Sequence, residues 1–460
     1  MLLERIVSEG ISHNSYYVGS GLDAAVIDPR RDVDIYLHLA KRNSQKITHI
    51  FESHRNEDYV VGSLELSKLT GARIIHGSKL DFSYGVSARE GDAFNIGSLE
   101  FGVLETPGHT DESISLTVKD LDTSTDIFMV FTGDTLFAGD VGRTDLYGED
   151  HRRKLSGDLY DSLFNKLLKI GDEVIVLPGH GAGSVCGANI GLRDFTTIGY
   201  ERKTNPALKN KTREAFIQFK MKEVLETPPY FKKMEQYNRL GPPIIKLPDP
   251  ESMSVSEIKR FEGKDCLMVD LRMPEAFASG HIPNSLSIWK NGLPLFAGWI
   301  LNYSDPIILI KEEDQDIGET VRYLYRLGFD NIAGYLHKGI ASWYRNGEQV
   351  TRNEVWSVHD LKKNLSNDDL FILDVRDSKS YLSQGYIKRA NHIYIGHLKN
   401  RLPELPKNKT ICVYCDSGFK TGIAISILSA AGFRSVIGVL GGFNAWSKSG
   451  YPVEKAVSPV

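Results

Sequence analysis

Cysteine is scarce in this sequence: its 460 residues include four, at positions 186, 266, 412 and 415. Four scattered thiols cannot form the disulfide framework of a small secreted protein, so we expect a reduced, cytoplasmic protein. No apolar run has the length of a membrane span, and no signal peptide is visible at the N-terminus. An excess of positive charge is also missing, since the net charge is -4, which argues against a nucleic-acid binder.

The sequence does contain a long internal repeat. "LMVDLRMPEAFASGHIPNSLSI" and "FILDVRDSKSYLSQGYIKRANHI" both read as an apolar strand, Asp-x-Arg, a short helix and a glycine. Further along, "GIASW" and "GFNAW" repeat at nearly the same spacing. A period this long indicates two copies of one domain, and the alternation of strands with helices predicts a parallel sheet in each. The proline-rich "RLGPPIIKLPDP" reads as the linker before the first copy.

The first 240 residues are richer in strands. Four apolar runs, "ITHIFESH", "FGVLETPGH", "IFMVFTGD" and "EVIVLPGH", each end at a side chain that can bind a metal: His54, His109, Asp134 and His180. One histidine after a strand is most often a turn or core residue. Four such endings predict a metal site, because functional side chains gather at strand ends on a rigid scaffold.

These segments resemble known families. "SHRNED", "TPGHT", "FTGD" and "LPGHG" resemble the metallo-β-lactamase fold, and the repeats resemble rhodanese domains. The order of the three, together with "PGHGAGSVCG" and "TIGYERKTN", resembles the bacterial persulfide dioxygenase–rhodanese fusions over nearly the whole chain. The resemblance implies an αββα sandwich followed by two rhodanese-like α/β domains with parallel sheets. It places a persulfide dioxygenase domain at 1–240, a rhodanese-like domain without a catalytic cysteine at 251–352 and a rhodanese domain at 353–460.

The loop "SHRNEDY" decides how many metals to expect. Dinuclear zinc hydrolases of this fold use every His and Asp of His-x-His-x-Asp-His, but here Asn56 and Tyr59 stand where two of the histidines would be. What remains is His54, His109 and Asp134, a set that matches the two-His, one-carboxylate triad of non-haem iron oxygenases. It is also the triad that the resembled family keeps. We therefore expect one Fe(II) per chain, with zinc as the less favoured alternative.

Four further residues belong to the predicted surroundings of the metal. Asp58 and His180 are expected to orient the ligands by hydrogen bonds, or simply to hold loops together. Arg143 could receive the anionic end of a substrate, with Asp145 orienting the Arg143 side chain. Alternatively, Arg143 and Asp145 could form an ion pair on the surface. Cys186 reads most simply as a small buried apolar residue, although "GAGSVCG" resembles a fusion-family segment with a cysteine near the iron entrance.

A second chemistry is predicted in "TICVYCDSGFKTGIAISIL". An apolar strand delivers Cys415 into a loop that contains Gly418 and leads into a helix. Backbone N–H groups and a helix N-terminus stabilise a thiolate or persulfide there. The segment resembles the rhodanese active loop, with Lys420 in place of the frequent arginine. Cys412 lies inside the strand, so we expect it to face the core rather than pair with Cys415.

The first copy has no thiol at this loop. Its matching segment is "IILIKEEDQDIGETV", with Lys311 or Glu312 in the position of the cysteine. The acids that follow would repel a thiolate or a sulfur oxyanion. We expect this copy to be inactive and to space or dock its neighbours.

The resulting expectation is an enzyme that oxidises a low-molecular-weight thiol persulfide with O2 to sulfite or thiosulfate and transfers sulfur through Cys415. The sequence leaves open whether the protein forms a homo-oligomer. One rival is a thioester hydrolase resembling glyoxalase II, against which Asn56 and Tyr59 argue. The other is a catalytically decayed interaction or regulatory protein, against which the intact Cys415 loop argues.

Overall fold

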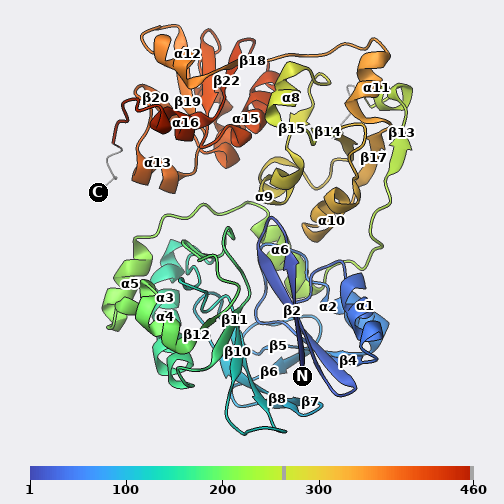
Figure 1. Cartoon of the computed structure of the whole chain (residues 1–460), viewed down its shortest axis with the longest axis vertical. Coiled ribbons are helices and arrows are strands. Elements are labelled where there is room, and N and C mark those ends of the chain that lie inside the picture. Colours follow the sequence, from blue (N-terminus) through green and yellow to red (C-terminus); the bar gives the residue numbers. More distant parts are fainter. Residues whose placement is uncertain (262–265, 456–460) are drawn as a thin grey trace. The chain divides into compact units, whose positions relative to one another are not determined.

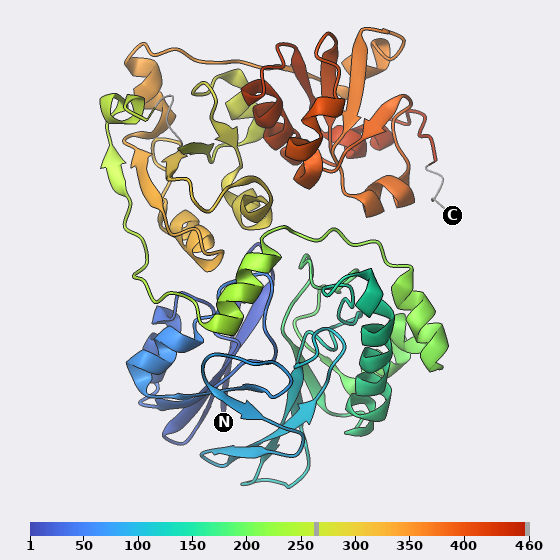
Figure 2. The same cartoon turned by 180° about the vertical axis from the view of Figure 1, so that it is seen from behind.

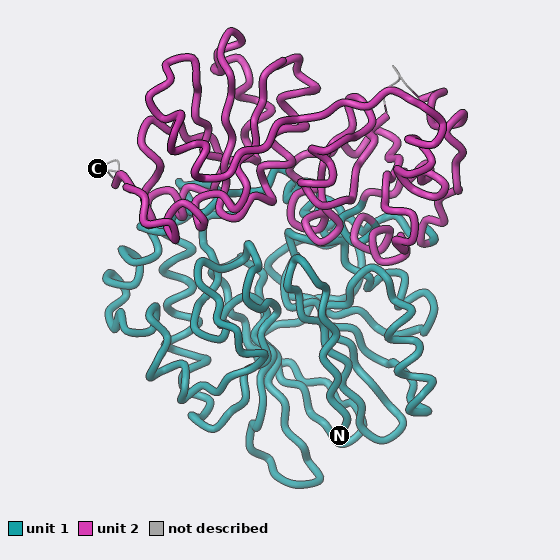
Figure 3. The backbone as a smooth tube through the Cα atoms, turned by 45° about the horizontal axis from the view of Figure 1, so that its top comes forward, with its two compact units in different colours: residues 1–246, 325–328 teal, residues 247–324, 329–460 magenta. Residues whose placement is uncertain are grey.

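The computed structural model describes residues 1–261 and 266–455 and divides into two compact units, coloured separately in Figure 3. The first unit is Met1–Lys246 with Tyr325–Gly328, and the second is Leu247–Leu324 with Phe329–Val460. Both rhodanese-like copies therefore lie in the second unit. The finer boundaries expected at 240, 251 and 353 remain predictions.

The first unit contains two six-stranded sheets (Figure 1). One sheet runs in chain order through β1 (Leu2–Ser8), β2 (His13–Ser20), β3 (Asp23–Ile27), β4 (Lys46–Phe51), β5 (Arg73–Gly77) and β6 (Val86–Ala88). The other has the order β12-β11-β10-β9-β8-β7, from β7 (Ala93–Ile96), β8 (Leu99–Glu105), β9 (Ile114–Asp120), β10 (Met129–Gly133), β11 (Ile175–Pro178) and β12 (Thr196–Thr197). Both sheets mix parallel and antiparallel pairs.

Apolar side chains from the two sheets form a shared core. Phe51, Phe101 and Phe131 lie in it, and their rings stack on one another. The outer face of the first sheet is packed by α1 (Asp34–Arg42) and α2 (Ser63–Thr70). The outer face of the second is packed by α3 (Glu149–Asn165), α4 (Ile198–Thr204) and α5 (Arg213–Met221). This helix–sheet–sheet–helix order confirms the αββα sandwich. The unit also contains α6 (Phe231–Leu240) and the 3-10 helices η1 (Leu167–Lys169) and η2 (Ala207–Lys209).

The second unit contains two five-stranded sheets whose pairs are all parallel, as predicted for the two copies. The first has the order β13-β17-β16-β14-β15, from β13 (Glu251–Met253), β14 (Leu267–Asp270), β15 (Leu286–Ser287), β16 (Ile307–Ile310) and β17 (Ile332–Leu336). The second has the order β18-β22-β21-β19-β20, from β18 (Glu354–Trp356), β19 (Leu370–Asp374), β20 (Ala390–His392), β21 (Thr410–Tyr414) and β22 (Val436–Val439).

Helices connect the parallel strands in both copies, as Figure 2 shows from behind. The first copy has α7 (Val255–Lys259), α8 (Pro274–Ser279), η3 (Lys290–Gly292), α9 (Leu293–Ile300), α10 (Gly318–Arg326) and α11 (Gly339–Arg345). The second has α12 (Val358–Lys363), α13 (Ser378–Gln384), η4 (Ile395–His397), α14 (Leu398–Arg401), η5 (Leu402–Glu404), α15 (Phe419–Ala430) and α16 (Gly442–Lys448). Among the described residues, no helix combines the length and the apolar character that crossing a bilayer requires.

Candidate metal centre and sulfur-transfer loop

The four predicted strand endings supply the residues of one buried site. His54 follows β4, His109 follows β8, Asp134 follows β10 and His180 follows β11. All four side chains are almost completely buried. Glycine allows the close approach: a Cβ on Gly133 would lie 2.5 Å from Ser53 Oγ, and Gly133 has a φ of +49°. The strands and this tight turn therefore bring Asp134 beside His54.

Nitrogen and oxygen atoms converge at the centre of the site. His54 Nε2 lies 3.7 Å from Asp134 Oδ2, and His109 Nε2 lies 3.5 Å from the same oxygen. None of these three atoms has a hydrogen-bond partner among the described residues. Buried polar atoms are normally paired, so a convergent unpaired group fits a metal ion.

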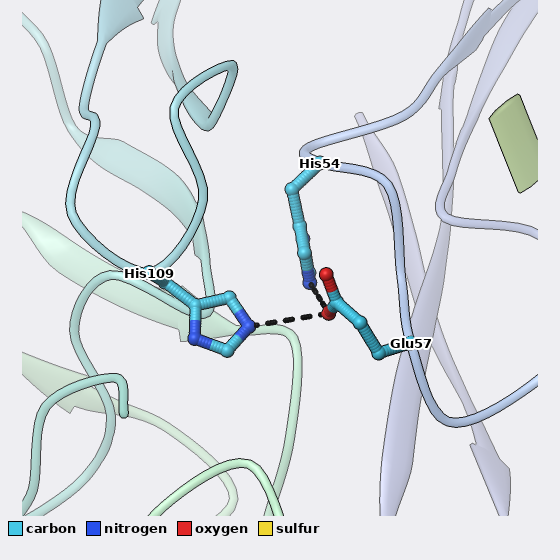
Figure 4. Close-up of side chains that lie close together, drawn as sticks. All are labelled: His54, Glu57 and His109. Atoms are coloured by element: carbon cyan, nitrogen blue, oxygen red, sulfur yellow. Dashed lines mark ion pairs between the residues drawn. The ribbon is translucent and has the colours of Figure 1, made fainter. Parts of the chain in front are cut away.

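Glu57, which the sequence analysis did not select, is the fourth member of this cluster. Its Oε2 lies 3.5 Å from His109 Nε2 and 3.9 Å from His54 Nε2 (Figure 4). This Oε2 atom has no hydrogen-bond partner within the described part of the chain. The one signal in the sequence is an acid directly after Asn56, at a position that the His-x-His-x-Asp-His pattern leaves unspecified.

The two imidazoles are held through their other ring nitrogen. His109 Nδ1 lies 3.0 Å from the carbonyl oxygen of Arg143 and donates to it, which leaves Nε2 facing the cluster. His54 Nδ1 lies 2.8 Å from Ser53 Oγ. Hydrogen bonds of this kind fix the tautomer and the ring orientation of metal-binding histidines.

The electrostatics of the cluster favour negative carboxylates and a neutral His54. Burial lowers the pKa of His54 to about 4. Burial alone would raise the pKa of Glu57, but contact with His109 and the charge of Arg55 outweigh it and lower that pKa to about 2. For Asp134, burial is likewise outweighed by the neighbouring histidines, His180 foremost, and its pKa falls well below the usual range. Deprotonated carboxylates and neutral imidazole are the forms that bind metals.

His180 lies between two carboxylates instead of pointing at the cluster. Its Nδ1 is 2.7 Å from Asp134 Oδ1, and its Nε2 is 2.9 Å from Asp58 Oδ2. Burial would lower the pKa of His180, but these two acids raise it well above its ordinary value. Both ring nitrogens therefore donate, and His180 fixes Asp134 in the orientation that leaves Oδ2 to the cluster.

The side chains of Asn56 and Tyr59, which stand where a dinuclear site would have histidines, form hydrogen bonds to backbone carbonyl groups. Asn56 Nδ2 donates to the carbonyl oxygen of His54 over 3.2 Å, and the Tyr59 hydroxyl donates to that of Asp28 over 3.4 Å. The ring of His13, another buried residue that the sequence analysis missed, lies 3.9 Å from the Tyr59 ring between centroids. The His13 ring in turn lies 5.5 Å from the His180 ring between centroids. The described residues also hold a second group of potential ligands, Asp58, His180 and Cys186, in which His180 is already bonded to Asp58 and Asp134.

The structure places Cys186 next to the cluster and Arg143 in the framework around it. The Cys186 thiol lies within 4.8 Å of ligand atoms of His109 and Asp134, and burial raises the pKa of that thiol well above the usual value. The Arg143 guanidinium is fully buried and pairs with Asp145 at 2.7 Å. It also donates to the carbonyl oxygens of Val185 and Glu226. Arg143 thus ties three loops together, and its donors face protein acceptors.

The loop that the sequence predicts to transfer sulfur follows β21. Cys415 is buried, and its Sγ accepts a hydrogen bond of 3.1 Å from the backbone N–H of Gly418, whose φ is +103°. Helix α15 begins at the next residue. Lys420 pairs with Asp416 at 2.7 Å, and although burial alone would lower the pKa of Lys420, the nearby acids raise it. Cys412 is buried within the strand, where burial raises its pKa to about 12.

The first copy places Lys311 at the position of Cys415. The backbone N–H of Phe443 donates to the Cys415 carbonyl, and the N–H of Ile340, at the matching point of the repeat, donates to the Lys311 carbonyl. The Lys311 ammonium is buried and donates to the carbonyl oxygens of Glu312 and Glu313 over 3.2 and 2.8 Å. This loop therefore surrounds a cation, whereas the second copy's loop offers a backbone donor to a thiol.

Comparison with known families accounts for most of the chain. Residues 9–180 match the family described as the Metallo-beta-lactamase superfamily, and residues 255–346 and 357–449 each match the Rhodanese-like domain. The chain spans about half the length of the curated mycobacterial relatives that it matches, which are uncharacterized proteins.

Individual proteins show the same likeness. A hydroxyacylglutathione hydrolase of Rhizobium johnstonii is 30% identical over 40% of this chain and 77% of its own length. The crystal structure of a metallo-beta-lactamase from Staphylococcus aureus subsp. aureus COL is 27% identical, with a TM-score of 0.65 over 73% of this chain and 99% of that one. ETHE1 from Myxococcus xanthus is 32% identical over 52% of this chain and 98% of that one, with a TM-score of 0.46. The chain belongs to the metallo-beta-lactamase superfamily and carries two rhodanese-like domains after that domain.

Proposed function

We propose that this protein is a mononuclear iron persulfide dioxygenase coupled to a sulfurtransferase. One observation carries the proposal: His54, His109 and Asp134 present unpaired atoms to one cluster, whereas Asn56, Tyr59 and His180 form hydrogen bonds to other groups. Two imidazoles and one carboxylate form the ligand set of non-haem iron oxygenases. The rhodanese-like domains support a sulfur compound as the substrate.

The proposed reaction is RSSH + O2 + H2O → RSH + SO3²⁻ + 2H⁺. The sulfane sulfur loses four electrons, which O2 accepts, and the S–S bond breaks to release the thiol. Fe(II), when bound, would supply the redox chemistry that lets O2 react with the persulfide. The chain holds the ligands in place through Ser53, the Arg143 carbonyl and His180.

Cys415 carries the second half of the proposal. The Cys415 thiolate would take the outer sulfur of a second RSSH and release RSH, forming the enzyme persulfide. That persulfide would transfer its outer sulfur to sulfite, giving Cys–S⁻ and S2O3²⁻, with cleavage of one S–S bond and formation of another. The Gly418 N–H, the start of α15 and the Lys420 charge all favour the thiolate that leaves in this step. Persulfide would then leave the protein mainly as thiosulfate.

Thioester hydrolysis is the second candidate, because the curated relatives include hydroxyacylglutathione hydrolases. The directions of Asn56 and Tyr59 argue against it, since an activated hydroxide between two metals needs both ligand sets. The two candidates also differ in their metal requirement, so one measurement separates them.

The decisive test is metal analysis of protein purified without oxygen, together with oxygen uptake on adding a glutathione or cysteine persulfide. We expect about one iron per chain and persulfide-dependent oxygen uptake. His109→Ala should lose both the metal and the uptake. Two zinc ions per chain with thioesterase activity would instead establish the hydrolase.

A further inference from the structure

We propose that Glu57 is a fourth metal ligand, so that the centre is built from two histidines and two carboxylates. This deepens the proposed function and rests on its metal site. The loop of β4 would then supply two ligands, His54 and Glu57, to a centre completed by His109 and Asp134.

The geometry matches such a set. Glu57 Oε2 lies 3.5 and 3.9 Å from the two Nε2 atoms, and Asp134 Oδ2 lies 3.5 and 3.7 Å from the same two nitrogens. Around a metal with bonds of about 2.1 Å, neighbouring donor atoms are about 3.0–3.4 Å apart. Both carboxylates therefore lie beside the same two imidazoles, and the ligand atoms of His54, Glu57 and His109 all lie within 4.8 Å of one another.

The two oxygens of Glu57 are used differently. Arg55 Nη2 donates to Oε1 over 3.2 Å, and the backbone N–H of Arg55 is itself held by Glu112 Oε1 over 2.9 Å. Oε2 is left without a hydrogen-bond partner among the described residues and is aimed at the cluster. A carboxylate that served only to pair with Arg55 would not need to present its second oxygen, completely buried, to two imidazoles.

The orientation of Asn56 explains why the next residue, Glu57, is the one that reaches the metal cluster. In the dinuclear hydrolases the residue at this position is a histidine ligand, but here its side chain turns back to the carbonyl oxygen of His54. The backbone of Asn56 is held as well, because Asn238 Nδ2 donates to its carbonyl oxygen over 2.7 Å. The next side chain, Glu57, is the one that enters the site.

The fourth ligand changes the chemistry of the centre in two ways. Two carboxylates balance the charge of a divalent metal, whereas a triad with one carboxylate leaves one positive charge. A fourth ligand also occupies one of the positions that the triad would leave open. A set of two imidazoles and two carboxylates suits iron or manganese better than metals that prefer thiolate ligands.

The test compares full-length wild-type protein with Glu57→Gln and Glu57→Asp. Metal affinity is measured for Fe(II) by competition with a chelator, and the d–d absorption spectrum is recorded after substitution with Co(II). Glu57→Gln should weaken Fe(II) binding by more than about 100-fold, since even the loss of an outer hydrogen-bonding partner costs about 10–100-fold. Glu57→Asp should weaken it by less and shift the Co(II) bands. If Glu57→Gln does not fold, the Asp variant decides.

Glu52→Gln is the matched control. Glu52 is buried in the same loop region, but its carboxylate accepts from the Tyr84 hydroxyl over 2.9 Å, a hydrogen bond that glutamine can also accept. Its metal affinity should stay within about threefold of the wild type, well inside the about 10–100-fold loss that marks a perturbed site.

The outcomes separate this inference from the proposed function. One iron per wild-type chain with unchanged affinity and spectrum in both Glu57 variants would overturn the role of Glu57 and leave the dioxygenase proposal standing. Zinc in the wild type with weaker zinc binding in Glu57→Gln would keep Glu57 as a ligand and overturn iron. A wild-type protein that binds neither metal would overturn both.

Discussion

The two rhodanese-like copies share a framework and differ at one loop. In each, a buried Asp–Arg pair closes the turn after the strand β14 or β19: Arg272 with Asp270 at 2.7 Å, and Arg376 with Asp374 at 2.6 Å. Each arginine also donates to a glycine carbonyl at the end of the next helix. The Asp-x-Arg signature is therefore architectural, and its presence says nothing about activity.

The loop that follows the central strand of each sheet, β16 or β21, carries the difference. In the second copy the Gly418 N–H points at Cys415 Sγ, whereas in the first copy the carbonyl oxygens of Glu312 and Glu313 point at the Lys311 ammonium. The same scaffold thus presents opposite polarity at equivalent positions. We therefore expect activity in this fold to depend on which backbone groups the loop turns inward, as well as on the residue in the centre.

The largest expected effect is that of Cys415→Ser. If the first copy is inactive, this variant should lose thiosulfate–cyanide sulfur transfer by at least about 1,000-fold, because no other loop supplies a nucleophile. The measurement is thiocyanate formation by the full-length protein with its iron content checked. Substantial residual transfer would mean that the first copy, or Cys186, contributes.

The same variant also tests whether the two chemistries cooperate. A shared chain gives short tethers effective concentrations of about millimolar, so wild-type protein should convert persulfide mainly to thiosulfate when external sulfite is low. Cys415→Ser should keep its oxygen uptake but shift the product toward sulfite. Quantifying both products alongside oxygen uptake checks this, and an unchanged ratio would separate Cys415 from the trapping step.

The next largest effect should be shared by both copies. Arg376→Ala and Arg272→Ala each remove the charged partner of a buried aspartate, which costs about 3–5 kcal/mol of unfolding free energy. Urea unfolding followed by tryptophan fluorescence and circular dichroism measures the loss. Similar losses of unfolding free energy in the two variants would support a common framework. A loss in one variant alone would show that the Asp–Arg pair has different roles in the two copies.

A smaller effect is expected for Lys420. Lys420→Met removes the charge beside the Cys415 loop and should lower sulfur transfer about tenfold, which corresponds to roughly 1.4 kcal/mol of charge stabilisation. Lys420→Arg retains the charge and should stay close to wild type. The pH dependence of Cys415 alkylation distinguishes a thiolate effect from a packing effect, because only the former moves the profile toward higher pH.

The smallest effect should come from adding a thiol to the first copy. Lys311→Cys in the Cys415→Ser background should remain below about a hundredth of wild-type transfer, because the loop would face the new thiol with carbonyl oxygens instead of N–H donors. The same thiocyanate assay measures it. Recovery of transfer would show that the central residue alone decides activity.

The sequence predicts the architecture because its signals are periodic. The apolar strands that end at His54, His109, Asp134 and His180 do converge, and the repeat of Asp-x-Arg does mark two parallel sheets. These features depend on the alternation of strands with helices and on the spacing of repeated motifs, both of which can be read from short segments of the sequence.

Glu57 could not be predicted in this way. Whether an acid in a loop faces solvent, an arginine or a metal depends on the turn between neighbouring residues, here set by the bonds of Asn56 to His54 and Asn238. The choice between Lys311 and Glu312 required the contact with Ile340, which comes from a distant part of the same copy. The burial of Arg143 likewise depends on carbonyl groups contributed by separate loops.

The unpaired atoms of the metal centre also affect the stability of the metal-free protein in a cell. Each buried polar group without a partner costs about 1–3 kcal/mol of stability, and the centre has four of them within the described chain, on His54, Glu57, His109 and Asp134. A metal that binds the folded chain alone recovers this free energy by mass action. Folding and metal supply are therefore coupled, and a cell short of the metal would hold a larger unfolded fraction exposed to its proteases.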